Sequence, residues 1–349
     1  MINANYRKAV HFEHPDYIPM VFHINDSCWE NYPQEELFDL MESHKYLFPG
    51  FVRPKGRYVP DYAPIARKDF PFTDDFGCVW TTMMDGITGT VTGHPLADWE
   101  AFKTYRAPDP AVCMGIGPVD WEKEAERIRR SKETDGAAEA WLRHGHTFLQ
   151  LCDLRGYENF LFDMIDEDER LWALIELVEN FNRALVEKYI ALGVDQLSYA
   201  EDLGAQHGPM ISPELFRKYI QPSYRRLMKP AIDKGLIVHM HSDGDIRELA
   251  DDLIESGVQV INLQDLVNGV DWIAGRFRGK ICVDLDIDRQ KITPYGTPEQ
   301  VDALVREEVE KLATPQGGLT MIYGLYPGIP MANVKALMDA MEKYMFLFD

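Results

Sequence analysis

The feature that most constrains the fold is a regular alternation of short apolar runs and amphipathic segments, from about residue 144 to the end of the chain. The apolar runs predict strands at 147–151, 195–199, 236–240, 258–262, 280–283 and 319–323. The segments between them predict helices at 166–192, 212–234, 246–255, 297–312 and 331–345. Strands that alternate with helices pair in parallel through right-handed crossovers. At least five such units predict an α/β fold, a TIM (β/α)8 barrel, with a doubly wound sheet as the rival.

The first third of the chain lacks this regularity and is rich in Pro, Gly and aromatic residues. We expect an irregular N-terminal part over residues 1–110, with a short strand at 18–22 and a hairpin at 73–92. Residues 111–140 are expected to form an exposed helical insertion, because residues 121–135 are highly charged. The whole chain, 1–349, is predicted to be one barrel domain with this N-terminal extension and insertion.

The net charge excludes several classes of partner. The chain has 36 Lys+Arg against 57 Asp+Glu, a formal charge of −21. Nucleic acid and anionic membrane surfaces would repel such a chain. No apolar run approaches the roughly 18 residues of a membrane span, and no signal peptide is evident at the N-terminus. The five cysteines show no C-x-x-C spacing, so we expect a reducing, cytoplasmic location.

Polar residues gather where the predicted strands end, which is where a barrel places its catalytic groups. Successive side chains of a strand alternate between its two faces, so His239 and His241 share one face. The candidates at the other strand ends are Glu201, Asp202, Asp243, Asp284 and Tyr323.

This set suits either a metal ion or acid–base chemistry. A catalytic zinc takes three protein ligands and keeps one position open. His241 and Asp243 are two residues apart across a strand end, and a third ligand is available from Glu201, Asp202 or Asp284. Without metal, the same groups can serve as a general acid and base. Structural roles compete, because Asp243 can cap the next helix and His239 can be a core histidine.

Several segments resemble the uroporphyrinogen decarboxylase superfamily, which includes cobalamin-dependent methyltransferases. The principal ones are V-H-M-H-S-D-G-D-I-R-E-L-A-D-D-L-I-E-S-G-V (238–258) and Y-A-E-D-L-G-A-Q-H-G-P-M-I-S-P-E-L-F-R-K-Y-I-Q-P (199–222). P-Y-G-T-P-E-Q-V (294–301) and P-G-I-P-M-A-N-V-K-A-L (327–337) follow in the family's order. Earlier, D-D-F-G-C-V-W (74–80) and H-P-L-A-D-W-E-A-F (94–102) look like the methyltransferase branch. The resemblance covers roughly residues 70 to 345 and implies a TIM barrel.

The departures from the family pattern shape the expected chemistry. In the thiol-methylating members, one His and two Cys hold zinc. Here His241 falls on the His position, Asp243 falls on the first Cys, and Tyr323 falls near the second. Ligands of N and O keep zinc more Lewis-acidic than thiolates do, which suits an ether oxygen. The resemblance therefore implies an O-demethylating enzyme that moves a methyl group from a methoxylated small molecule to Co(I) of a corrinoid-binding protein.

In that interpretation, Glu201, His241 and Asp243 hold zinc, and Tyr323 or Asp202 donates a proton, with Asp284 as a further catalytic group. The residues expected to bind the substrate are Phe22, Trp29, Trp80, His239 and His207, which allow an aromatic donor. The cobalamin is expected on the partner protein, and a homodimer is compatible with the sequence.

Two other functions remain open at this point. A decarboxylase of uroporphyrinogen, a polycarboxylate, needs clustered arginines, yet residues 18–33 contain no Lys or Arg. Arg53, Lys55, Arg57 and Arg67 are the basic residues that support this alternative. The third candidate is a non-catalytic relative that binds a corrinoid or a metal.

Overall fold

The computed structural model describes residues 2–348. They form two compact units, each of which has its own set of parallel strands. Among the described residues, unit 1 comprises 2–4, 72–80 and 91–263, and unit 2 comprises 5–71, 81–90 and 264–348. Parallel strands alternating with helices confirm the α/β class and the TIM-barrel type of fold.

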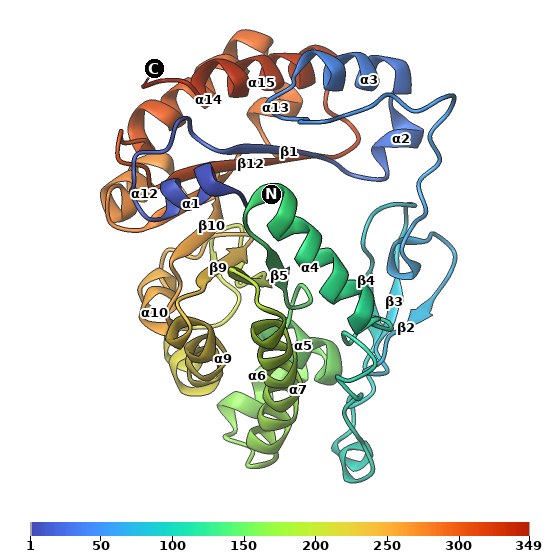
Figure 1. Cartoon of the computed structure of the whole chain (residues 1–349). Coiled ribbons are helices and arrows are strands. Elements are labelled where there is room, and N and C mark those ends of the chain that lie inside the picture. Colours follow the sequence, from blue (N-terminus) through green and yellow to red (C-terminus); the bar gives the residue numbers. More distant parts are fainter. Residues whose placement is uncertain (1, 349) are drawn as a thin grey trace. The chain divides into compact units, whose positions relative to one another are not determined.

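Unit 1 contains four parallel strands in the order β10-β9-β6-β5 (Figure 1). They are β5 (Glu139–Trp141), β6 (Gln196–Glu201), β9 (Ile237–Ser242) and β10 (Val260–Gln264), whose last residue belongs to unit 2. The helices of this unit are α4 (Trp121–Asp135), α5 (Phe148–Arg155), α6 (Tyr157–Ile165), α7 (Arg170–Leu192), α8 (Pro213–Leu215), the π-helical turn η3 (Phe216–Ile220), α9 (Gln221–Asp233) and α10 (Ala250–Ser256).

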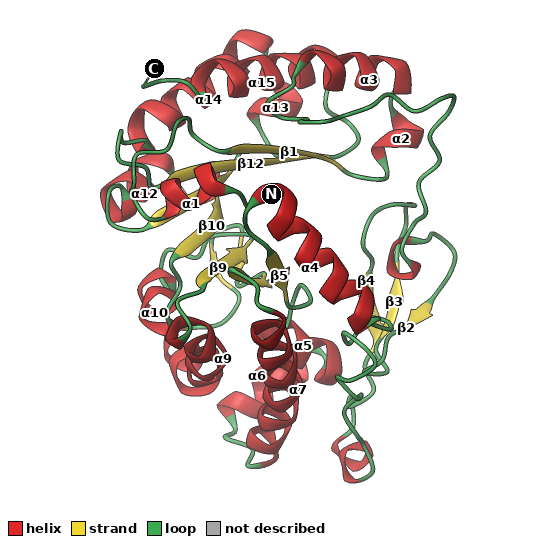
Figure 2. Ribbon diagram, viewed as in Figure 1, coloured by secondary structure: helices red, strands yellow, loops and turns green. Residues whose placement is uncertain are grey.

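Unit 2 contains three parallel strands, with β12 (Leu319–Leu325) between β1 (Met20–Ile24) and β11 (Cys282–Asp286). Figure 2 shows α14 and α15 on one side of β1 and β12. The helices are α1 (Ala4–Val10), α2 (Cys28–Asn31), α3 (Gln34–Ser43), the 3-10 turn η1 (Pro64–Ala66), α11 (Asp265–Asn268), α12 (Val270–Phe277), α13 (Ile292–Tyr295), α14 (Pro298–Leu312) and α15 (Met331–Tyr344).

The hairpin predicted at 73–92 belongs to a sheet of three short strands, β2 (Phe72–Thr73), β3 (Val79–Thr81) and β4 (Thr90–Gly93), which is followed by η2 (Trp99–Lys103). The strands β2 and β3 pair antiparallel. A further two-stranded ribbon, β7 (Gly204–Ala205) and β8 (Gly208–Pro209), follows β6.

Local sequence signals account for some of the helix ends. Thr297 caps α14, accepting from the Gln300 N–H while the Gln300 side chain accepts from the Thr297 N–H. The Ser212 hydroxyl caps α8 by accepting from the Leu215 N–H, and Pro213 takes the first helical position. The charged helix predicted at 121–135 is α4, in which Ile128 is the buried residue.

One predicted element is wrong. Residues 147–151 form the start of α5 rather than a strand, and the strand of this region is β5, a few residues earlier. The run T-F-L-Q-L is short and apolar, a pattern that a buried strand and a buried helix share. The start of the helix is fixed by a distant carboxylate, that of Glu201, which accepts from backbone N–H groups at Thr147 and Phe148.

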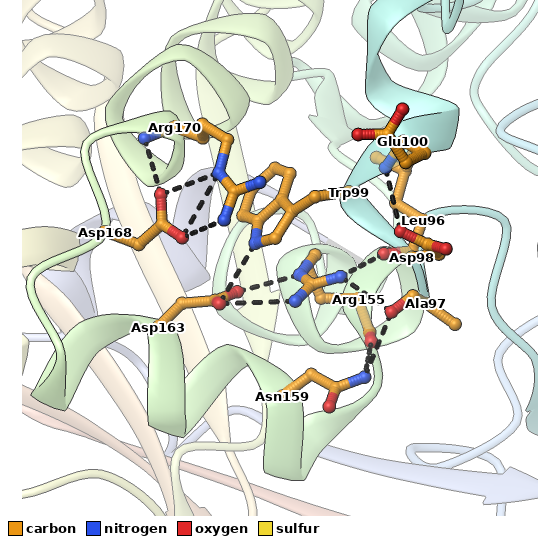
Figure 3. Close-up of polar contacts among 10 residues, drawn as sticks. All are labelled: Leu96, Ala97, Asp98, Trp99, Glu100, Arg155, Asn159, Asp163, Asp168 and Arg170. Atoms are coloured by element: carbon orange, nitrogen blue, oxygen red, sulfur yellow. Dashed lines mark hydrogen bonds and ion pairs between the residues drawn. The ribbon is translucent and has the colours of Figure 1, made fainter.

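A buried polar cluster fastens η2 to the helices of unit 1 (Figure 3). The Asp163 carboxylate accepts from Arg155, at 2.7 Å from Nε, and from the Trp99 indole N–H at 3.1 Å. The guanidinium carbons of Arg155 and Arg170 lie 4.3 and 4.9 Å from the centre of the Trp99 ring. Because Arg155 also donates to the Ala97 carbonyl, the segment before η2 is held in place as well.

Within residues 2–348, none of the helices is both long enough and apolar enough to span a bilayer.

Candidate active site

Three side chains that can bind a metal meet at the C-terminal ends of adjacent strands in unit 1. His144 follows β5, Asp202 follows β6, and His241 lies near the end of β9. One Asp202 Oδ atom lies 3.2 Å from His144 Nε2 and 3.6 Å from His241 Nε2. The donor atoms all lie within 4.8 Å of one another. We call these three residues the His-Asp-His cluster.

The imidazole of His241 is oriented by Asn262 on the neighbouring strand β10. Its Nδ1 is hydrogen-bonded to the Asn262 side-chain carbonyl, and Asn262 stands opposite His241 in the β9–β10 register. With that carbonyl accepting, the Nδ1 atom carries the proton. Nε2 is then the atom that faces Asp202, as in a metal-ligating histidine held by an outer partner.

The charges within the cluster shift the pKa values of Asp202 and His241 in opposite directions. Burial acts to raise the pKa of Asp202, but hydrogen bonds and charge from His144 and His241 hold it far below its usual range. Burial likewise acts to lower the pKa of His241, but the hydrogen bond to Asp202 and the charge of Asp243 raise it to about 9. Without a metal, Asp202 is therefore ionised and His241 is protonated at neutral pH.

Backbone contacts between two loops set the spacing of the cluster. The Gly204 N–H donates to the Asp243 carbonyl at 3.1 Å, and the Leu203 N–H donates to Ser242 Oγ at 2.8 Å. The Asp243 N–H donates to Asp202 Oδ1 at 3.2 Å. The loops after β6 and β9 are thereby tied together, and Asp202 is fixed beside the end of β9.

Asp243 lies beside the cluster. Its carboxylate is 3.7 Å from His241 Nε2, and 40% of its side chain is exposed. Its side chain is thus more exposed than that of His241, which is 22% exposed, and it lies outside the group of three donor atoms.

Glu201 points away from the cluster into the helical layer. It is fully buried, and its carboxylate accepts from the N–H groups of Thr147, Phe148 and Leu149 at the start of α5. Burial raises the pKa of Glu201 to about 7, against the effect of these three hydrogen bonds. The helix N-terminus thus takes up the carboxylate that the sequence assigned to zinc.

The other candidates of unit 1 have different surroundings. His239 is half-buried on the same face of β9 as His241, and His207 is exposed in the turn between β7 and β8. Trp80 is buried, donates its indole N–H to Asp74 at 2.8 Å and lies under the guanidinium of Arg143.

The remaining candidates belong to unit 2 and are described within it. Tyr323 is fully buried and donates its hydroxyl to Thr293 Oγ1 at 3.1 Å, and burial raises the pKa of its phenol. Phe22 packs on Tyr323, with ring centres 5.2 Å apart. Asp284 Oδ1 accepts from the Thr320 hydroxyl at 2.7 Å. Trp29 is buried, 5.5 Å from the centre of the Phe38 ring.

The sequence analysis missed His144. It stands in H-G-H-T just after β5, but the strand was predicted at 147–151, so His144 lay before the strand instead of at its C-terminal end. The available signal was the stretch A-A-E-A-W-L at 137–142, apolar except for Glu139, which contains β5.

The donor set of the cluster suits a divalent transition metal. Two imidazoles and one carboxylate are a common set of protein ligands for catalytic zinc, which keeps a further position for water or substrate. Asp202 is already ionised, and His241 presents Nε2. The residues therefore fit the metal that the family resemblance implies.

Comparison with known proteins identifies the family. The family model described as uroporphyrinogen decarboxylase (URO-D) matches residues 88–344. The uroporphyrinogen decarboxylases of Homo sapiens and Pongo abelii are each 23% identical over 188 residues, which cover 50% of this chain and 48% of each relative. The chain thus spans about half the length of these curated relatives. A methyltransferase from Methanosarcina mazei has a similar fold, with a TM-score of 0.65 and 15% identity over 99% of both chains.

Proposed function

The chain belongs to the uroporphyrinogen decarboxylase (URO-D) family, and we propose that it is a methyltransferase of this superfamily. Its reaction moves a methyl group from a methoxylated small molecule to Co(I) of a corrinoid-binding protein. The observation that carries the proposal is the His-Asp-His cluster at the strand ends of unit 1. The fold shared with a Methanosarcina methyltransferase is compatible with it.

The chemistry needs a group that stabilises the oxygen from which the methyl group departs. A zinc ion held by His144, Asp202 and His241 would supply a Lewis acid at that point. The chain's own part is to orient His241 through Asn262 and to keep Asp202 ionised as a ligand. A carboxyl group with so low a pKa is a poor proton donor, so we assign Asp202 to binding rather than to proton transfer.

If no metal is bound, protonated His241 can serve as a general acid in place of the zinc ion. The pKa of about 9 keeps His241 protonated at pH 7. With Nδ1 bonded to Asn262, the second proton resides on Nε2, which faces Asp202. That proton can pass to the leaving oxygen as the methyl group departs.

The charges of the N-terminal part favour this substrate over a polycarboxylate. Arg53 is paired with Asp39, and Arg57 is paired with Glu30. Arg67 forms an ion pair with a further carboxylate 3.1 Å away. Three of the four cations that support a decarboxylase are therefore paired with acidic side chains, and Lys55 is the fourth.

A decarboxylase is the second candidate, because the curated relatives that match the chain have that activity. The two functions differ in their products. Decarboxylation releases CO2 from a porphyrinogen without a corrinoid, whereas methyl transfer changes the absorption spectrum of the corrinoid.

The test begins with metal analysis of protein purified without chelator. We expect about one equivalent of zinc in the wild type and less than about a tenth in His241→Gln and Asp202→Asn, which each remove one ligand. His11→Gln, an exposed histidine in the turn after α1, is the matched control and should keep its zinc. Less than a tenth of an equivalent in the wild type would remove the metal from the proposal.

The second step is methyl transfer to free cob(I)alamin from a panel of methoxylated compounds. We expect methylation of the cobalt, monitored spectroscopically, with wild type and His11→Gln but not with His241→Gln. Release of CO2 from porphyrinogens, with no methylation from any donor, would replace the methyltransferase with the decarboxylase.

A further inference from the structure

The loop that carries His144 leads into a helix whose own N-cap residue does not cap it. The loop spans residues 142–147, and α5 begins at Phe148. Thr147 occupies the N-cap position, but its side chain makes no capping hydrogen bond, and its Oγ1 lies 2.6 Å from His146 Nδ1 instead. The first N–H groups of a helix have no acceptor within the helix, so another group has to accept from them.

The acceptor is the carboxylate of Glu201. Its Oε1 accepts from the N–H groups of Thr147 and Phe148 at 2.6 and 2.8 Å, and its Oε2 accepts from the Leu149 N–H at 3.2 Å. Both oxygens are thus occupied by the start of α5, and the side chain is fully buried. Because a buried N–H that loses its acceptor is costly, this carboxylate fixes the start of α5 against the end of β6.

The turn that contains His144 lies directly on this first turn of α5. Gly145 has a φ of +72°, and a Cβ added to it would lie 2.8 Å from the Leu149 Cβ. The Gly145 N–H also donates to the Ala200 carbonyl at 2.8 Å, which places the turn beside the end of β6. The position of His144 therefore depends on the same helical turn that Glu201 holds.

The two histidines of the His-Asp-His cluster are supported in different ways. The ring of His241 is oriented by a hydrogen bond from its Nδ1 to the side chain of Asn262. The side chain of His144 is 50% exposed, and its Nε2 lies 3.2 Å from Asp202 Oδ1. With half of its side chain in solvent, His144 depends on the backbone of its loop for its place in the cluster.

We infer that Glu201 is a positioning residue of the metal site, which keeps His144 at the distance from Asp202 that a shared metal ion requires. The end of β6 then serves the cluster twice, because it supplies Asp202 directly and places His144 through the start of α5. Residues outside the ligand set that orient a ligand change metal affinity by about tenfold to a hundredfold. The inference rests on the proposed function in one respect, which is that the cluster binds zinc.

The test is the zinc affinity of the full-length protein, measured by competition with a chromogenic chelator. Glu201→Ala removes the acceptor and should weaken zinc binding by about tenfold to a hundredfold. Glu201→Gln keeps a carbonyl oxygen for the first two N–H groups of the helix, so it should restore most of the affinity. Glu179→Ala is the matched control for lost stability, because Glu179 is also a buried glutamate of unit 1 and accepts from Ser223 and Arg226. Equal losses of zinc affinity in the two alanine variants would overturn the inference.

A double-mutant cycle shows whether Glu201 acts through His144. In a His144→Gln background, Glu201→Ala should change the zinc affinity by less than about twofold, because the ligand that it positions is gone. In an Asn262→Ala background, which removes the support of the other histidine, the same variant should show its full loss, because the two supports act on different ligands. Losses of equal size in both backgrounds would overturn the inference, since Glu201 would then act on stability alone.

A metal-free measurement separates this inference from the proposed function. Modification of histidines by diethyl pyrocarbonate, located by peptide mapping, reports how firmly His144 is held beside Asp202. We expect Glu201→Ala to raise the rate at His144 several-fold and to leave the rate at the exposed His11 unchanged. If the wild type takes up no zinc but this change is seen, the positioning role remains and the metal is lost. If zinc binds but neither its affinity nor the rate at His144 responds to Glu201→Ala, the metal remains and the positioning role is lost.

Discussion

His241 is held from both sides, by Asn262 at Nδ1 and by Asp202 at Nε2. The first contact sets the tautomer, and the second sets the charge. A histidine arranged in this way is ready to bind a metal, but it also holds a proton strongly when no metal is bound. The two ligands compete for the same nitrogen atom, so the pH controls which one is bound.

The first prediction concerns this competition. Because the pKa of His241 in the metal-free protein is about 9, zinc has to displace a proton at neutral pH. We expect the affinity for zinc to rise by about tenfold per pH unit between pH 6 and pH 8, as for the release of one proton. Competition with a chromogenic chelator at several pH values measures this slope.

The same measurement should be made on Asp243→Asn, because the charge of Asp243 helps to raise the pKa of His241. The variant should show a shallower slope as pH 8 is approached. An affinity that does not change with pH in the wild type would contradict the assignment of His241 as a ligand.

A second residue-scale prediction concerns a buried acid of unit 2. Glu308 on α14 is fully buried, and no hydrogen-bond donor among the described residues reaches either of its carboxylate oxygens. Burial and the charges of Asp265 and Asp288 raise its pKa well above the usual range. A raised pKa in the folded state means that folding binds a proton, so stability is greatest at acid pH and falls as the pH rises.

Glu308→Gln supplies a permanent N–H donor toward Asp265 and carries no charge. We expect it to be more stable than the wild type at pH 8, by about 1–3 kcal/mol, and to lose less stability between pH 5 and pH 8. Urea denaturation at the two pH values measures both effects. Glu310→Gln, an exposed neighbour on the same helix, should leave the pH dependence unchanged, and identical curves for the two variants would refute the argument.

The residue scale is also where sequence reasoning was least complete. His241 was recognised, because it ends an apolar strand and fits the family pattern. The distinction between Glu201 and Asp202 was accessible through the alternation of β6, in which Tyr199 and Glu201 are buried on one side. That Glu201 holds the start of α5 depends on contacts across more than fifty residues, which no local pattern encodes.

At the scale of elements, the cluster depends on two loops that approach very closely. A Cβ added at Gly244, whose φ is +80°, would lie 2.1 Å from the carbonyl carbon of Gly204. Both the left-handed backbone and the lack of space require glycine at this position. The close approach allows the backbone bonds that tie Asp202 to the end of β9.

Gly244→Ala should therefore destabilise the protein by at least about 2 kcal/mol, because strain and clash add together. It should also weaken zinc binding, since Asp202 and His241 move apart. Gly136→Ala is the matched control, because Gly136 has a φ of +76° but nothing within 4 Å of the added Cβ. Calorimetric melting and zinc content measure the two effects, and equal losses in both variants would show that the contact is unimportant.

Elements were predicted well wherever the periodicity was long. The helix predicted at 331–345 is α15, and the strand predicted at 319–323 is part of β12. Short apolar runs were the weak point, since 147–151 is helical and β5 was not recognised. That single displacement concealed His144, because a site residue is recognised by its position relative to a strand end.

At the scale of the whole molecule, the fold was predictable because strands and helices alternate over most of the chain. The division into two compact units was not, because it depends on contacts between segments far apart in sequence. The charge of −21 likewise limits the partners but says little about where individual charges are compensated.

The last prediction concerns the effect of the net charge of −21 on stability. Repulsion among excess carboxylates destabilises the folded state, and salt screens it over about 10 Å at 0.1 M. We expect the Tm at pH 7.5 to rise by about 2–4 °C when KCl is increased from 20 mM to 500 mM. Near the isoelectric point, about 4.9, the same increase should have little effect. A Tm that falls with salt at pH 7.5 would mean that the ion pairs outweigh the repulsion.

The buried carboxylate of Glu201 has a practical consequence for redesign. Positions 201 and 202 are neighbours in sequence, yet one anchors a helix and the other faces the cluster. A library that seeks new metal preferences can exchange residues at 144, 202, 241 and 243 for cysteine without removing the anchor of α5. Position 201 belongs to the scaffold, and such a library should leave it fixed.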